Sequence, residues 1–539
     1  MLLTNSLTYQ SNTLNIIIFT DKILHYGLMV HHISNYALVM GISYNTYTRK
    51  ATKYSMLSLI IAVIISFQLT LAYGQPEVKH STIQEECLTS DGGLRLTITN
   101  KHQQFDWQDR STLDKDIYSP KSVKILPDNS KYYVNSLEGC CTVVYDLKSN
   151  KKLKVIQHTM NYDKLYLWNN LSGLFPFRKY MQNVMRFRGK PVESTLTHNA
   201  KYLWVTYYKR SFDINAQEPS AIAVIDTDAD SIVRMMECGP LPKMIATSND
   251  NKTVAVTHWG NNTVGLIDCS SDNPKQWHYT GLITVLEKYT PDFSTTTPIN
   301  RDFESGLKLR GTIFLPGDRY LLVGCMTGGY GIAVIDVIKR QYIGRITGMY
   351  SSPRHLIVSK GDLYCSCNIS GYVAKIALKD IEQAIQKMQK GSKVIELGWH
   401  NCKVGKGART IVASPDGKYI FVTCNNDSKL DVIDADKMQV VGRMTIDSFP
   451  VGLAISSDGH HLIVTSQGID KMGGNAVNII KIDYLKKAIK EIENREDKSK
   501  GGDSTSNDFA KKYWLIALLS ILSIIAIFNL AIKKKDNYQ

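Results

Sequence analysis

The chain has 539 residues, of which 43% are hydrophobic and 21% charged, a composition typical of a folded protein and not of a disordered one. Its formal net charge of +15 permits nucleic-acid binding. Part of that charge comes from lysines that lie beside an apolar segment near each end of the chain. As described below, these segments indicate that the protein is exported, so we expect no nucleic-acid partner.

An apolar stretch near the N-terminus, 56–71, follows three basic residues within 49–53 and precedes the small-x-small sequence Ala-Tyr-Gly at 72–74. This arrangement is typical of a secretory signal peptide. We therefore expect residues 1–74 to form an N-terminal extension and signal peptide, with a retained membrane anchor as the alternative. Whether the segment before Met40 is a genuine part of the protein stays open.

Residues 75–119 form a polar lead-in with one alternating stretch, Gly93–Thr99, which reads GLRLTIT. Alternation of apolar and polar residues predicts a half-buried strand.

One phrase recurs through 120–483. At 407–434 it reads GARTIVASPDGKYIFVTCNNDSKLDVID, three apolar runs separated by turn residues, which predicts a β-meander. A fourth run follows most copies, such as VVGRMTI from Val440. The copies begin at Pro120, Pro191, Pro242, Leu309, Pro353, Ala408 and Pro450. Four strands in each of seven copies predict an all-β fold, a seven-bladed β-propeller.

This repeat resembles that of the bacterial YVTN-type (YncE-like) β-propeller family, over Pro120–Asp483. The resemblance implies the propeller fold but says little of function, because propellers host binding, scaffolding and catalysis alike. In such a ring we expect Gly93–Thr99 to supply the outer strand of the last blade and so close the circle.

Three segments interrupt the repeats. An aromatic and basic stretch, Met160–Lys190, is interpreted as a loop and helix on the rim, or alternatively as a lid or partner patch. Gln276–Gly306 is a polar surface excursion between blades three and four. Leu378–Gln389 has apolar residues at helical spacing, which predicts an amphipathic helix within blade five.

After the repeats, 484–511 is expected to form a helix and a flexible tether. The next segment, 512–532, contains twenty uncharged residues from Tyr513, enough to cross a hydrocarbon core of about 30 Å. Three lysines begin the tail, 533–539, and lysine marks the cytoplasmic side. We therefore expect a single-pass cell-membrane protein whose propeller lies on the extracytoplasmic, periplasmic side.

The ten cysteines fall mostly within or at the ends of predicted strands, which favours buried free thiols. Cys87 and Cys402 are predicted to lie in loops, so they are the better candidates for a disulfide in an exported protein.

The residue just after the opening position of each repeat is cationic in five of seven copies and anionic in none. In a propeller these residues should ring one mouth of the central channel, where their fields add and attract an anion. Glu193 and His355 follow one position later. Pairing with acidic neighbours, or plain solvation, is the alternative. The seven residues are Lys121, Val192, Lys243, Arg310, Arg354, Arg409 and Val451.

The residue that closes each second strand gives a companion series. Its members are Ser136, Tyr207, His258, Cys325, Cys367, Cys424 and Ser466. Zinc or copper would accept several of these side chains, but the second strands of different blades diverge, so we expect no metal site. Tyr207, His258 and Trp259 are instead predicted to line the ligand pocket.

The sequence contains no recognisable catalytic, haem or phosphate-loop motif, and no cofactor is expected. The sequence therefore favours a monomeric binding protein for an anionic small molecule, peptide or glycan. The alternatives are a scaffold for an envelope protein partner, or a hydrolase resembling lactonase-type propellers with Glu193, His258 or His355 as acid–base groups.

Overall fold

A computed structural model describes residues 78–485, apart from 106–109, 169–171, 176–185, 211–212, 214–217, 290–298, 328 and 470–473. The predicted signal peptide, tether and transmembrane helix lie outside these described residues. Within them, no helix is long and apolar enough to cross a bilayer. The chain divides into two units, Met1–Ser90 with Arg95–Asp483, and Asp91–Leu94 with Tyr484–Gln539. The first unit contains the propeller.

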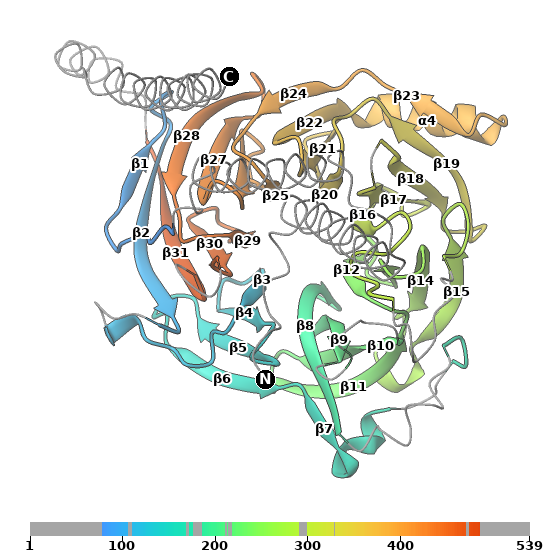
Figure 1. Ribbon diagram of the computed structural model, residues 1–539, viewed down its shortest axis with the longest axis horizontal. Helices are drawn as coiled ribbons and strands as arrows, with labels where there is room; N and C mark the ends of the chain where they lie inside the picture. The colour runs from blue at the N-terminus through green and yellow to red at the C-terminus, as the bar shows by residue number, and fades with distance from the viewer. Residues whose placement is uncertain are drawn as a thin grey trace, which may run out of the picture. The chain divides into compact units, whose positions relative to one another are not determined.

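The described strands of this unit form seven sheets, the blades, and confirm the predicted seven-bladed β-propeller (Figure 1). Each blade begins at the channel with its innermost strand. Blade one comprises β3 (Pro120–Ile125), β4 (Lys131–Ser136), β5 (Cys141–Asp146) and β6 (Lys152–Gln157). Blade two comprises β8 (Arg186–Thr197), β9 (Tyr202–Arg210), β10 (Ser220–Asp226) and β11 (Ser231–Cys238), with the short β7 (Thr159–Asn161) beside β8.

The next two blades follow the same order. Blade three comprises β12 (Pro242–Thr247), β13 (Thr253–His258), β14 (Thr263–Asp268) and β15 (His278–Thr284). Blade four comprises β16 (Leu309–Phe314), β17 (Tyr320–Cys325), β18 (Gly331–Asp336) and β19 (Gln341–Thr347), with β23 (Val394–Glu396) parallel to β19 at its edge.

The last three blades complete the ring. Blade five comprises β20 (Pro353–Ser359), β21 (Asp362–Cys367), β22 (Tyr372–Ala377) and β24 (His400–Lys403). Blade six comprises β25 (Ala408–Ala413), β26 (Tyr419–Cys424), β27 (Lys429–Asp434) and β28 (Gln439–Thr445). Blade seven comprises β29 (Pro450–Ile455), β30 (His461–Ser466), β31 (Ala476–Tyr484), β2 (Leu94–Gln103) and β1 (Glu86–Leu88).

The innermost strands contact one another in chain order around the channel, and β29 returns to contact β3. Because each blade is covered by a neighbour on both faces, its central strands are buried on both sides and their sequences are continuous apolar runs. In β17, for example, Leu321, Leu322 and Val323 are fully buried. The core therefore consists of layers between blades, arranged around the channel.

The ring is closed by the N-terminal strand β2, which pairs with β31, as predicted for Gly93–Thr99. The hydroxyl of Thr99 donates to the carbonyl of Ile479 at 3.3 Å. A buried ion pair, 2.8 Å between Lys101 Nζ and Asp447 Oδ1, fastens β2 to the segment between blades six and seven. The two ends of the domain thus share one blade.

Two of the predicted interruptions are placed by the structure. The helix predicted within blade five is α4 (Leu378–Gln389), and its apolar face is buried. The excursion predicted for Gln276–Gly306 is shorter than expected, because β15 within it is the fourth strand of blade three. β15 was missed in the sequence analysis because turn residues directly before it obscured its alternation of apolar and polar residues.

The stretch Met160–Lys190 contains a 3₁₀ helix, η2 (Tyr162–Leu167), and the start of β8. Within it Phe175 is buried and packs on the ring of Tyr279, so part of this insertion belongs to the core between blades two and three.

All ten cysteines are free thiols in the structure. Cys87 and Cys402 were expected in loops and as disulfide candidates, but they lie in β1 and β24. This prediction was wrong, because both segments are short edge strands whose alternation is too brief to show in the sequence. The other eight thiols are buried, as predicted for small apolar core residues.

Candidate anion-binding site at the channel mouth

Each innermost strand carries a β-bulge at the same register, next to the first residue of the repeat. In β3, Pro120 pairs with Ser136 and Ser122 with Asn135, which leaves Lys121 as the extra residue. The same pattern leaves Lys243 extra in β12 and Arg354 extra in β20. In β8, β16, β25 and β29 a register shift occurs at the corresponding place. A bulge re-aims the side chain that it carries, so the repeat directs equivalent side chains to one place.

The chain enters most of these strands through a sharp turn. In six of the seven repeats the residue before the opening position has a positive φ. Left-handed backbone costs a residue other than glycine about 1–2 kcal/mol, so the surrounding structure must hold this turn in place. The six residues are Ser119, Leu241, Lys308, Ser352, Gly407 and Phe449.

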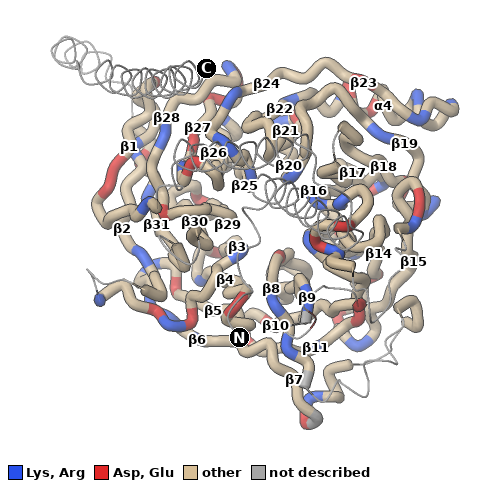
Figure 2. The backbone as a smooth tube through the Cα atoms, viewed as in Figure 1, with Lys and Arg blue, Asp and Glu red and all other residues tan. Residues whose placement is uncertain are grey.

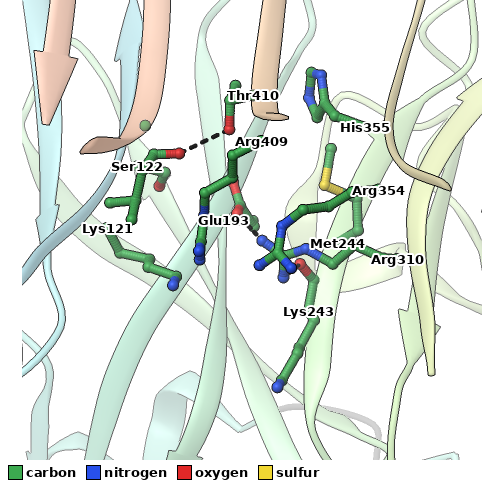
Figure 3. A network of polar contacts seen from close by, with 12 residues as sticks. Lys121, Ser122, Glu193, Lys243, Met244, Arg310, Arg354, His355, Arg409 and Thr410 are labelled. Carbon is green, nitrogen blue, oxygen red and sulfur yellow. Dashed lines mark hydrogen bonds and ion pairs between the residues drawn. The ribbon is translucent and has the colours of Figure 1, made fainter. Parts of the chain in front are cut away.

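The cationic residues of this register converge at the channel mouth (Figure 3). We call Lys121, Glu193, Arg310, Arg354 and Arg409 the cationic cluster. Lysine and arginine occur around the whole ring, interspersed with acidic residues (Figure 2). The cluster is therefore distinguished by how few carboxylates it contains: four cations and one carboxylate give it a formal charge of +3.

Arg310 is the paired member of the cluster. Its Nη2 lies 2.6 Å from Oε1 of Glu193, and its Nη1 donates to the carbonyl of Lys243 at 2.5 Å. The Arg310 side chain is only 7% exposed, so this ion pair is largely removed from water. The alternative in which ring cations pair with acidic neighbours is therefore correct for Arg310.

Lys243 is also neutralised, by a residue that the sequence analysis did not consider. Its ammonium group pairs with the carboxylate of Asp302, which accepts a hydrogen bond from the hydroxyl of Tyr208. The same ammonium lies 3.8 Å from the ring centroid of Trp259, a cation–π contact. Asp302 comes from the segment between blades three and four, so this excursion reaches the site.

The remaining cations have no carboxylate partner among the described residues. Arg409 is 7% exposed, and its guanidinium lies 5.5 Å from the Phe449 ring. Arg354 directs Nη1 to the sulfur of Met326 at 3.5 Å, and its buried Nε has no hydrogen-bond partner. The ammonium of Lys121 donates only to the side-chain oxygen of Gln467, at 3.3 Å.

Mutual repulsion follows from this crowding. Burial and then the charge of Arg310 lower the pKa of Arg409 to about 9, so Arg409 remains charged at neutral pH. Burial and the neighbouring arginines also lower the pKa of Lys121 and of Arg354. An anion bound among these three side chains would relieve both the repulsion and the missing hydrogen bond.

A cavity of about 480 Å³ lies in the channel and is lined by the residues that follow the bulges, among them Glu193 and His355. The Nδ1 of His355 accepts a long hydrogen bond, 3.4 Å, from the amide of Ile411. Burial, followed by the charges of Arg310 and Lys124, lowers the pKa of His355 to about 3. His355 is therefore neutral at physiological pH and adds no charge to the site.

Two residues expected in the pocket wall lie elsewhere. Tyr207 is fully buried, and its hydroxyl forms a hydrogen bond of 2.8 Å with Nδ1 of His158. His258 is also fully buried, and its Nδ1 forms a hydrogen bond of 2.7 Å with the hydroxyl of Thr263. Tyr207 lies inside β9, which continues to Arg210, whereas His258 is the last residue of β13, and neighbouring side chains enclose both. Trp259, one position later, does reach the cluster's neighbour Lys243.

Some predicted register positions carry no polar group to the site. Val192 and Val451 are buried. The three cysteines of the companion series, Cys325, Cys367 and Cys424, are buried at separate places in the core. Across the described ranges no group of three or more metal-ligating side chains could hold an ion.

The fold and the site together define a seven-bladed β-propeller with a cationic channel mouth. No family model matches the chain, and no curated protein matches it. Among solved structures, hydrazine synthase of Kuenenia stuttgartiensis is similar with a TM-score of 0.47 and 14% identity, covering 70% of this chain and 99% of that chain. The Cps50 (Swd1) β-propeller domain of Myceliophteria thermophila has a TM-score of 0.47 and 10% identity, covering 68% of this chain and 96% of that chain. Similarity at this level carries no functional argument, so the site must supply it.

Proposed function

We propose that this protein is a binding protein that recognises a carboxylate or phosphate group at the mouth of its propeller channel. One observation carries the proposal. Arg354 and Arg409 are held together by bulged strands and have no carboxylate partner in the described part of the chain. Like charges brought together in a low-dielectric site cost stability unless a ligand compensates them.

The neighbours of these two arginines support a preference for carboxylates or phosphates. Arg310 and Lys243, at the same register, each hold a carboxylate of the protein itself. Arginine presents a planar set of donors that matches two oxygens of a carboxylate or phosphate. A ligand oxygen pair between Arg354 and Arg409 would therefore repeat an interaction that the site already makes.

The test is thermal unfolding of the full-length protein with inorganic phosphate, citrate and an acidic glycan. A ligand at about 100 times its Kd stabilises a protein by about 2.7 kcal/mol. The variant pair Arg354→Gln with Arg409→Gln should remove the stabilisation. Arg95→Gln, an exposed arginine on the outer strand β2, is the matched control and should keep it. If no anion stabilises the wild type, a scaffold role becomes the better explanation.

We also propose that the chain is a divergent member of the YVTN-type repeat family, anchored to the cytoplasmic membrane with its propeller outside. The seven repeats support the first point, and the uncharged segment from Tyr513 with its three following lysines supports the second. Protease treatment of intact spheroplasts should digest the propeller and spare a tag at the C-terminus. If the protease digests the propeller only after the spheroplasts are lysed, this orientation is contradicted.

A further inference from the structure

The channel cavity that Glu193 and His355 line has somewhat more apolar than polar surface. Its wall is built by the innermost strands of six blades and the turns that follow them, and half of the lining residues are aliphatic. Those from blades two, five, six and seven include Leu196, Ile357, Val412, Leu453, Ala454 and Ile455. A hydroxyl or amide group that leaves water and lies against these aliphatic side chains finds no hydrogen-bond partner among them. Its burial there therefore costs free energy.

The polar members of the wall are largely occupied. The hydroxyl of Thr410 donates to the carbonyl of Val451 at 2.7 Å, and that of Ser457 donates to the carbonyl of Pro127 at 2.7 Å. The hydroxyl of Ser122 accepts from the side-chain amide of Asn135 at 2.9 Å. These three hydroxyls therefore serve the blades.

The charged members of the wall are few. Glu193 is held by Arg310, and Lys124 is the other charged side chain of the lining. In six of the innermost strands the residue directly after the register position lines the cavity, as Thr410 follows Arg409 and His355 follows Arg354. The cationic cluster and the apolar cavity are thus adjacent parts of one site.

We propose that the ligand is an amphiphilic anion, with a carboxylate or phosphate head at Arg354 and Arg409 and an unbranched apolar chain in the channel. This inference rests on the proposed anion-binding function and adds the class of ligand. The volume of the cavity falls within the range of about 300–1,000 Å³ common for small-molecule sites. A glycan or a polyphosphate would place many hydroxyl or charged oxygens against aliphatic side chains, so neither suits the cavity.

The experiment is calorimetric titration of the full-length protein with acetate, butyrate, hexanoate and octanoate, all below their aggregation concentrations. Each methylene buried in the channel should tighten Kd about three- to fourfold. A comparison of octyl phosphate with octanoate shows whether the site prefers a phosphate or a carboxylate head. Hexan-1-ol, a neutral compound of matched length, should bind at least tenfold more weakly than hexanoate.

Two variants test where the chain lies. Ala454→Phe fills the cavity and should abolish the gain from butyrate to octanoate while acetate still binds. Ile357→Thr, a smaller change that keeps the branched shape, should weaken octanoate severalfold and leave acetate unaffected. It decides the question if the Phe variant does not fold.

The outcomes separate the two proposals. Equal affinity for all four carboxylates, removed by Arg354→Gln with Arg409→Gln, would overturn the amphiphile and leave the anion site standing. Chain-length dependence that both channel variants retain would also overturn it, since the chain would then lie outside the channel. Absence of binding by every anion would overturn the proposed function itself.

Discussion

Arg310 on β16 and Glu193 on β8 form an ion pair, 2.6 Å between Nη2 and Oε1, that joins blade four to blade two across the end of blade three. The same guanidinium donates to the backbone carbonyl of Lys243 on β12, the blade between them. One arginine therefore connects three consecutive blades at the channel mouth, and it also determines how much positive charge the site keeps.

Glu193→Gln should destabilise the protein and strengthen anion binding. The variant leaves the Arg310 charge largely buried without its partner, and a hydrogen bond between charged groups is worth about 1.5–3 kcal/mol. The formal charge of the cationic cluster rises from +3 to +4, so the affinity for phosphate should increase. Urea unfolding and calorimetric titration measure the two effects. Lys418→Gln, which breaks an exposed pair of 3.7 Å, is the control and should change stability by less than about 0.5 kcal/mol.

Arg409→Gln should stabilise the unliganded protein. The substitution removes one of four crowded cations, and part of the repulsion that the others experience disappears with it. The gain should be about 1 kcal/mol at low salt and should shrink as added salt screens the cluster in the wild type. Thermal unfolding at 20 mM and 500 mM salt, roughly 20 Å and 4 Å in Debye length, provides the comparison. A loss of stability at both concentrations would mean that Arg409 is structurally paired.

The stability of the protein should fall with pH below about 6.5, before most carboxylates are protonated. Burial lowers the pKa of His158 and of His258 to about 3, and both are fully buried. Between pH 6.5 and 3 the unfolded chain binds more protons at these residues than the folded chain. Stability therefore rises with pH across this window and is lost as the pH falls, by about 1.4 kcal/mol per histidine and pH unit.

Urea unfolding at pH 7, 6 and 5 tests this dependence. In His258→Gln the slope should decrease by the contribution of one histidine, whatever the change in stability at pH 7. His278→Gln, the same substitution at an exposed side chain, serves as the matched control. A variant of His258 with the wild-type slope would show that another group dominates the acid loss.

Leu96→Ala should open the ring at its seam. Leu96 is fully buried on β2, the strand that completes blade seven, and a buried Leu→Ala change costs about 2–5 kcal/mol. Leu88→Ala on the neighbouring strand β1 removes a side chain that is 44% exposed and should cost less than about 1 kcal/mol. Limited proteolysis should detect early release of the N-terminal strands in the first variant only. Equal protection of both variants would mean that β2 is not the seam.

The fold could be predicted because the repeat encodes it more than once. Seven openings, each followed by an apolar run, a turn and a second run, leave little choice of topology, and the bulge at Lys121 or Arg354 recurs wherever the opening does. The position of the cationic residues followed from that register. The partners of these cations could not be predicted in the same way. The ion pair of Arg310 with Glu193, across blade three, depends on side-chain geometry that residue spacing does not reveal.

The errors at the site have a similar cause. His258 and Trp259 are neighbours in sequence, yet one is buried inside the blade and the other contacts Lys243, since successive residues at a strand end face opposite ways. Asp302 was missed because it lies in a polar excursion without periodicity, where nothing in the sequence indicates which residue turns toward the channel. An acidic residue in a long insertion near a cationic register is a signal worth testing in other propellers.

Asp302→Asn should increase the affinity of the site for anions. The carboxylate of Asp302 neutralises Lys243, and its own pKa is lowered by that ammonium group although burial opposes the effect. With asparagine in its place Lys243 becomes a fourth unpaired cation, after Lys121, Arg354 and Arg409, wherever it stays protonated. Burial already lowers the pKa of Lys243 to about 8, and the loss of Asp302 lowers it further. The Kd for phosphate should therefore fall about threefold to tenfold at about pH 6 and low salt, and change little at about pH 8. The gain should decrease as salt rises, since part of it is long-range attraction. Asp483→Asn, which disrupts a partly exposed pair with Lys481 on blade seven, is the matched control and should leave the Kd unchanged. Weaker phosphate binding in Asp302→Asn would instead show that this residue orders the mouth of the channel, and that its carboxylate does not compete with the ligand.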